Sequence, residues 1–137
     1  MADTTVPEAL IYVMVITSAS DRDMTDDELS RIGHVVQSWP IFQDFDANRI
    51  VDVARNCQKL LHEEAGLAGA LALIASVLPQ RFIDTAYAAA VEVATVDLEI
   101  RMEEHRILER LQETLKLDAA TAEAIERATK ARLRTMT

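Results

Sequence analysis

The sequence has few of the cysteines that cross-link small domains and few of the glycines and prolines that interrupt helices. It contains one cysteine, Cys57, so no intramolecular disulfide can form. Glycine and proline number three each, which favours long helices with few interruptions. Aromatic residues make up only 4% of the chain, so its core must be built from Ala, Val, Ile and Leu. The 137 residues are expected to form one domain, because a chain of this length can bury a sizeable core without staples.

Positive charge is also scarce. The chain has 14 basic and 23 acidic residues, a net charge of −9. Nucleic acids and anionic membranes require a basic face, so neither is expected as a partner. The apolar stretch 9–16 lacks the basic start of a signal peptide, and the uncharged run 65–78 is shorter than the roughly 20 residues of a membrane span. These features predict a cytoplasmic protein without membrane insertion.

What the sequence does contain is helical periodicity along most of its length. An apolar first helix is expected to begin at Pro7 and lie buried at the centre, and Thr25 with Glu28 forms a capping box for a second. We expect further helices after Asp46, over about 66–77, and from Pro79 to about Val96. Another is expected after the second acidic bend, with Ile107, Leu108, Leu111 and Leu115 on its apolar face, and a last one from Asp118 to about Arg134. The predicted fold class is therefore all-α, a single-domain bundle of about seven helices spanning residues 1–137.

Two stretches repeat each other, and both are acidic. Residues 19–28 read ASDRDMTDDE and residues 95–104 read TVDLEIRMEE. Both fit one pattern: an acid, any residue, an acid, an apolar residue, three residues, then Glu. The acids are Asp21, Asp23 and Glu28 in the first copy, and Asp97, Glu99 and Glu104 in the second. Each copy follows an apolar segment and precedes an amphipathic one, so the repeat predicts two similar helix pairs.

The repeated acids suggest a metal site at the two bends. Carboxylate oxygens suit hard cations such as Ca²⁺, Mg²⁺ or Mn²⁺. Asp21 and Asp97 are expected at helix C-termini, where the dipole disfavours negative charge that a cation would offset. The structural alternative is that these acids only shape turns, since Asp is a common turn former and the capping box explains Glu28.

Other catalytic and metal-binding patterns are absent from the sequence. No Glu-x-x-His motif, second zinc-ligating cysteine, Gly-rich phosphate loop or Gly-x-Ser-x-Gly occurs. An EF-hand starting at Asp21 would need Gly and Glu where the chain has Asp26 and Ile32. Without a nucleophile or an evident base, a cation-dependent hydrolase is disfavoured and no enzyme is expected. The three histidines are expected at the surface or its boundary, and Cys57 is expected to be a small buried hydrophobe.

The double motif resembles that of the TerB-like family of tellurite-resistance proteins, which are small all-helical domains. Members carry Ala-Asp-Gly-x-apolar-Ser-x-x-Glu between two helices and a degenerate copy later. The matching positions are Ala19, Asp21, Asp23, Met24, Thr25 and Glu28, then Ala94, Asp97, Glu99, Ile100 and Glu104. Arg22 and Leu98 stand where the family has glycine, which predicts an altered bend geometry. The resemblance covers about residues 8–135.

The resemblance implies a role in resistance to tellurite and other stresses, with acids suggested to bind a metal. Tellurite is an oxyanion that the acidic bends would repel, so a divalent cation or a protein partner is expected instead. The alternative is a helical protein-interaction module whose carboxylates only shape turns. That alternative predicts an exposed apolar patch, for example on the Ala/Leu helix at 66–77, and includes a homodimer.

Overall fold

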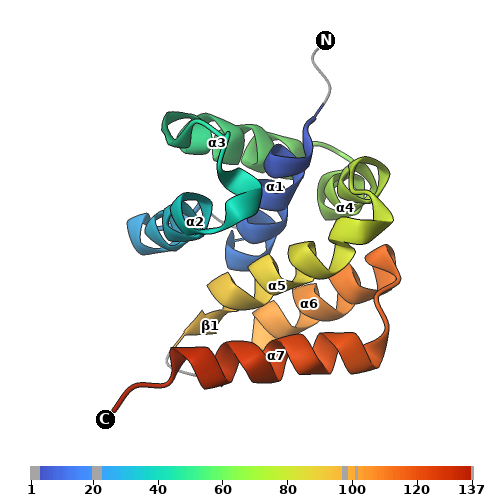
Figure 1. Ribbon diagram of the computed structural model, residues 1–137. Helices are drawn as coiled ribbons and strands as arrows, with labels where there is room; N and C mark the ends of the chain where they lie inside the picture. Colours follow the sequence, from blue (N-terminus) through green and yellow to red (C-terminus); the bar gives the residue numbers. More distant parts are fainter. Residues whose placement is uncertain (1–3, 20–22, 97–98, 101, 137) are drawn as a thin grey trace.

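The computed structural model describes residues 4–19, 23–96, 99–100 and 102–136, and in these residues the chain is almost entirely helical (Figure 1). The α-helices are α1 (Val6–Ala19), α2 (Asp26–Ser38), α3 (Ile50–Leu61), α4 (Gly66–Val77), α5 (Ile83–Ala94), α6 (Met102–Leu115) and α7 (Ala119–Leu133). Three single-turn 3-10 helices adjoin them: η1 (Pro40–Phe42), η2 (Ala47–Arg49) and η3 (Gln80–Phe82). The predicted all-α fold of seven helices is confirmed.

Helix α1 lies at the centre of the domain, as its all-round apolar sequence predicts. Every residue from Ala9 to Ala19 is buried. The helix contacts α2, α3, α4, α5 and α6, and Figure 1 shows it enclosed by α2 and α3 on one side and α4 on the other. A helix that is apolar on all faces is stable in water only when neighbours cover every face, and this arrangement provides that cover.

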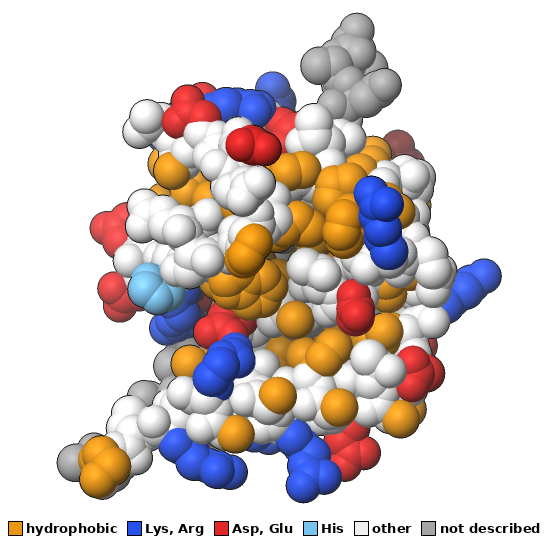
Figure 2. Space-filling model, viewed as in Figure 1, with side chains coloured by type: hydrophobic (Ala, Val, Ile, Leu, Met, Phe, Trp, Pro, Cys, Tyr) orange, Lys and Arg blue, Asp and Glu red, His pale blue; other side chains and the backbone are white. Residues whose placement is uncertain are grey.

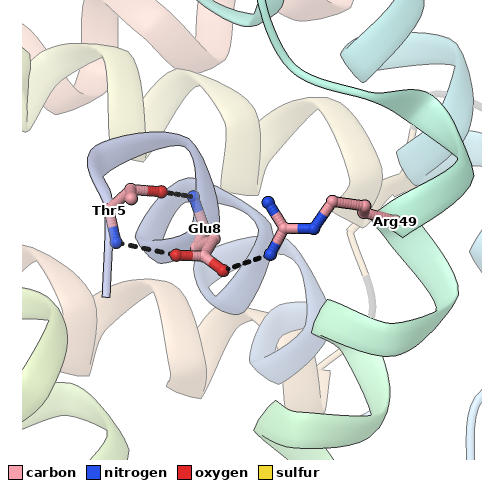
Figure 3. Close-up of polar contacts among 3 residues, drawn as sticks. All are labelled: Thr5, Glu8 and Arg49. Carbon is pink, nitrogen blue, oxygen red and sulfur yellow. Dashed lines mark hydrogen bonds and ion pairs between the residues drawn. The ribbon is translucent and has the colours of Figure 1, made fainter. Parts of the chain in front are cut away.

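Hydrogen bonds fix the start of α1 and join it to η2 (Figure 3). The backbone N–H of Thr5 donates to Glu8 Oε1 at 2.8 Å, and the N–H of Glu8 donates to Thr5 Oγ1 at 3.3 Å. Glu8 Oε2 accepts a hydrogen bond from Arg49 Nη2 at 2.9 Å. Thr5 and Glu8 thus form a capping box that satisfies orphan N–H groups of the first turn. The ion pair ties this turn to the segment leading into α3.

The two predicted helix pairs are present and lie side by side. α1 with α2 forms the first pair and α5 with α6 the second, and α1 packs on α5. α7 packs along α5 at the lower edge of the view in Figure 1. The repeat in the sequence therefore corresponds to repeated elements of the fold.

The fifth helix is shorter than predicted at both ends. Pro79 has an extended ψ of 154° and is followed by η3, so α5 begins only at Ile83. At the other end α5 stops at Ala94, and the prediction that it continues to Val96 is wrong. Two short antiparallel strands follow, β1 (Thr95–Val96) and β2 (Glu99–Ile100), with Val96 opposite Glu99.

No single helix among the described residues is long and apolar enough to cross a membrane. Helix α4 and the segment Gln80–Ala94 together have the length and apolar composition of a span, but a bend of 115° separates them.

Candidate functional site

The first acidic bend ends in a complete capping box. Thr25 Oγ1 accepts from the N–H of Glu28 at 3.1 Å, and Glu28 Oε1 accepts from the N–H of Thr25 at 2.9 Å. The Glu28 residue is 7% exposed, whereas Asp23 is exposed. Asp21 lies outside the described residues. The capping role predicted for Glu28 is therefore confirmed.

The described residues of the second acidic copy include the paired strands β1 and β2. The described backbone places Glu99 in β2, opposite Val96. Asp97 and the side chain of Glu99 lie outside the described part of the chain. Glu104 is the third residue of α6, the position that Glu28 has in α2, and it is also 7% exposed. The repeat therefore buries one glutamate in the first turn of each following helix.

The helices before the two bends end alike. Thr17 Oγ1 donates to the carbonyl of Val13 at 2.8 Å, and Thr95 Oγ1 donates to the carbonyl of Val91 at 2.7 Å. Both threonines are buried. Each hydroxyl group therefore bonds back to the carbonyl four residues earlier, which satisfies the buried polar group of the threonine just before the acids.

The start of α2 and the end of α5 are joined by a contact that the sequence did not predict. Arg31 Nη1 donates to the carbonyl of Val93 at 3.3 Å, across 62 positions of the sequence. Through this bond the helix that follows the first bend meets the helix that precedes the second. In the sequence, only the resemblance between the two acidic copies suggested that α2 and α5 lie close together. Nothing in the sequence indicated that Arg31 makes the contact.

The described acids alone do not form a metal site. Among the residues that the structure describes, no group of three or more His, Cys, Asp or Glu side chains could hold a metal ion. Of the six predicted ligands, the side chains of Asp23, Glu28 and Glu104 fall in that part of the chain. A site that uses the predicted ligands would have to include Asp21, Asp97 or Glu99.

The remaining candidate reactive groups lie where the sequence predicts. His34, His62 and His105 are exposed. Cys57 is fully buried, with Sγ 3.9 Å from the carbonyl oxygen of Tyr12. Burial raises the pKa of its thiol to about 12, because a thiolate would lose its hydration there. Cys57 is therefore a buried packing residue, and its thiol is a poor nucleophile.

The fold and the bends define a class of protein: a small all-α domain in which a helix pair joined by an acidic bend occurs twice. Residues 7–128, nearly the whole chain, match the family model described as tellurite resistance protein TerB. The chain therefore belongs to the TerB family. No curated protein and no solved structure matches it.

Proposed function

We propose that this TerB-family domain is a non-enzymatic, cytoplasmic protein of tellurite resistance that binds a divalent cation at its acidic bends. The ligands would be drawn from Asp21, Asp23, Glu28, Asp97, Glu99 and Glu104. The observation that carries the proposal is the pair of buried glutamates, Glu28 and Glu104, at the same position of two equivalent helices.

Burial of a carboxylate is unfavourable unless other groups compensate for its lost hydration. The capping box with Thr25 supplies that compensation to Glu28. Arg101 has no side-chain hydroxyl to accept from the N–H of Glu104, so the two glutamates share a buried helix position but not a complete reciprocal box. A divalent cation close to the hairpin would favour the charged form of Glu104 and offset the repulsion among neighbouring acids.

The contact between Arg31 and Val93 supports a shared rather than a split site. It brings α2 against the end of α5, so elements that flank the two bends lie at one end of the domain. Acids from both copies would then supply the several oxygen ligands that Ca²⁺ requires.

Thermal unfolding with and without Ca²⁺, Mg²⁺ or Mn²⁺ tests the proposal. A ligand that binds only the folded state adds about 2.7 kcal/mol at a hundredfold excess over its Kd, so the wild-type melting temperature should rise by several degrees. Glu104→Gln should remove most of this rise. Glu103→Gln is the matched control, because Glu103 is the exposed neighbour in the same turn and should leave the rise intact. No rise at millimolar metal, in wild type and Asp97→Asn alike, would contradict cation binding.

A second candidate function is that of an interaction module, and a partly exposed apolar surface favours it. Two adjoining grooves of about 510 and 340 Å³ share Ile41. Their apolar lining includes Trp39, Phe45 and Phe82, each partly buried. Figure 2 shows hydrophobic side chains gathered across the middle of this face. The outward side of α4 is different, since it presents mainly small residues such as Ala68, Ala72 and Ala75.

The occupant we propose for these grooves is a second copy of the chain. Sedimentation should then show a dimer that Ile41→Ser weakens and Val51→Ser does not, since Val51 is exposed and lines neither groove. A monomer at all concentrations would contradict this candidate.

A further inference from the structure

We propose that a pocket between α2, the end of α5 and the end of α7 binds the oxyanion group of a small organic phosphate through Arg31 and His34. The pocket measures about 350 Å³, a volume that suits a small ligand. Its described lining combines polar and apolar residues: Ser30, Arg31, His34, Glu92 and Thr95 are polar, and Val35, Val93 and Leu133 are apolar. None of the described lining residues is a proposed cation ligand, and the chemistry of this pocket is the opposite of theirs.

Arg31 is the group that would recognise the anion. Its guanidinium carries five N–H donors in a planar fork, a geometry that matches phosphate oxygens. One nitrogen, Nη1, donates to the carbonyl of Val93, which holds the fork at the wall of the pocket. Within the described part of the chain, no carboxylate forms an ion pair with Arg31. Its charge is therefore not neutralised there.

The surroundings of the pocket favour an anion, although the chain as a whole is acidic. The carboxylate of Glu92, the one acid in the described lining, is ion-paired with Arg132. Lys130 lies in the same last turn of α7 as Arg132. Figure 2 shows basic side chains at the lower edge of the molecule, where α7 lies, with acidic side chains beside them. The last turn of α7 thus carries two basic residues in a chain whose net charge is −9.

Two polar side chains lie where they could complete the binding of an oxyanion. Ser30 and His34 are four positions apart on α2, so they occupy one face of the helix and both line the pocket with Arg31. Ser30 offers a hydroxyl donor and His34 a ring N–H. The apolar lining residues Val35, Val93 and Leu133 would contact the organic part of the ligand.

Calorimetric titration of the intact protein with phenyl phosphate and with inorganic phosphate tests the inference. We expect saturable binding of phenyl phosphate, several times tighter than that of inorganic phosphate because of the apolar lining residues. Arg31→Gln should weaken it by at least about tenfold, as expected when a charge-assisted hydrogen bond is lost. Arg55→Gln is the matched control, since Arg55 is an exposed arginine on α3 that should not affect binding.

His34→Ala provides a second variant in case Arg31→Gln unfolds the domain, because His34 is exposed and its removal should leave the fold intact. It should reduce the affinity for phenyl phosphate severalfold, and phenyl phosphate should shift the NMR signals of the His34 ring in the wild type. The inference would be overturned by non-saturable binding, by equal affinity for the two ligands, or by His34→Ala binding as tightly as Arg55→Gln. The phosphate titration is run without added metal, so its result and that of the metal test are distinguishable: the inference and the proposed function stand or fall separately.

Discussion

Single polar side chains determine where the elements of this domain begin. Glu8 caps α1 with Thr5 and also pairs with Arg49, so one carboxylate fixes both a helix start and its attachment to η2. Partial burial raises the pKa of Glu8, but the hydrogen bonds with Thr5 and Arg49 and the charge of Arg49 outweigh it. The net result is a pKa below the ordinary value of 4.5.

This pKa shift predicts how stability depends on pH. A carboxyl group whose pKa is lower in the folded state stabilises the fold above its unfolded pKa, and that contribution disappears as pH falls through the folded value. At pH 7, Glu8→Gln should therefore be less stable than the wild type, and the difference should shrink as pH falls below about 4.5. Urea unfolding at several pH values measures this. Glu63→Gln is the control, because Glu63 is an exposed glutamate outside any helix.

The thiol of Cys57 should be unreactive in the folded protein. Because burial raises its pKa to about 12, the folded protein should react with a thiol reagent at pH 8 only through opening of the structure. The reaction should be fast in denaturant, where the thiol is hydrated. Rapid labelling of the native protein would show that the site around Cys57 and Tyr12 is open.

At the scale of the element, local motifs were predictable and non-local contacts were not. Thr25 and Glu28 act within one turn of helix, so their spacing alone predicts both the capping box and the start of α2. Val96 follows Val93 by three positions, a helical spacing of apolar residues that predicts α5 to continue to Val96. The pairing of β1 with β2 overrides this periodicity, and pairing across a turn leaves little trace in a single sequence.

The same limit applies to the candidate site. The repeat located the acids, because their spacing is a property of the sequence. The contact between Arg31 and Val93 depends on how α2 packs on α5, and no local pattern encodes that packing. The pocket lined by Arg31 and His34 is formed by three helices that are distant in sequence, so only the folded structure reveals it.

The capping box of α2 can be tested directly. Thr25→Ala removes the side chain that accepts from Glu28 and should lower the free energy of unfolding by about 1 kcal/mol. Ser30→Ala is the control, because Ser30 is exposed within the same helix and alanine is a good helix former. Chemical denaturation measures both variants. Equal stability of the two would mean that the box contributes nothing to the fold.

At the scale of the whole molecule, α1 is the element on which the others pack. It is buried on every side and contacts α2 to α6, so it links the two helix pairs to α3 and α4. This explains how a chain with few aromatic residues forms one core: aliphatic side chains of α1 meet those of its neighbours in every direction.

A core substitution in α1 should therefore destabilise the whole domain. Leu10 is fully buried, and Leu10→Ala should lower the free energy of unfolding by about 2–5 kcal/mol, through lost burial and the cavity left behind. Leu67→Ala, at a partly buried position of α4, should have a smaller effect. Calorimetry of both variants tests this, and comparable losses would contradict the central role of α1.

We propose above that acids from both bends bind one cation. A crystal structure of the protein grown with Ca²⁺ tests it most directly, through the positions of the Asp21 and Asp97 carboxylates. We expect one bound cation with oxygen ligands from both copies of the repeat, at about 2.3–2.6 Å. Carboxylates on opposite sides of the domain, with no cation at either bend, would contradict it.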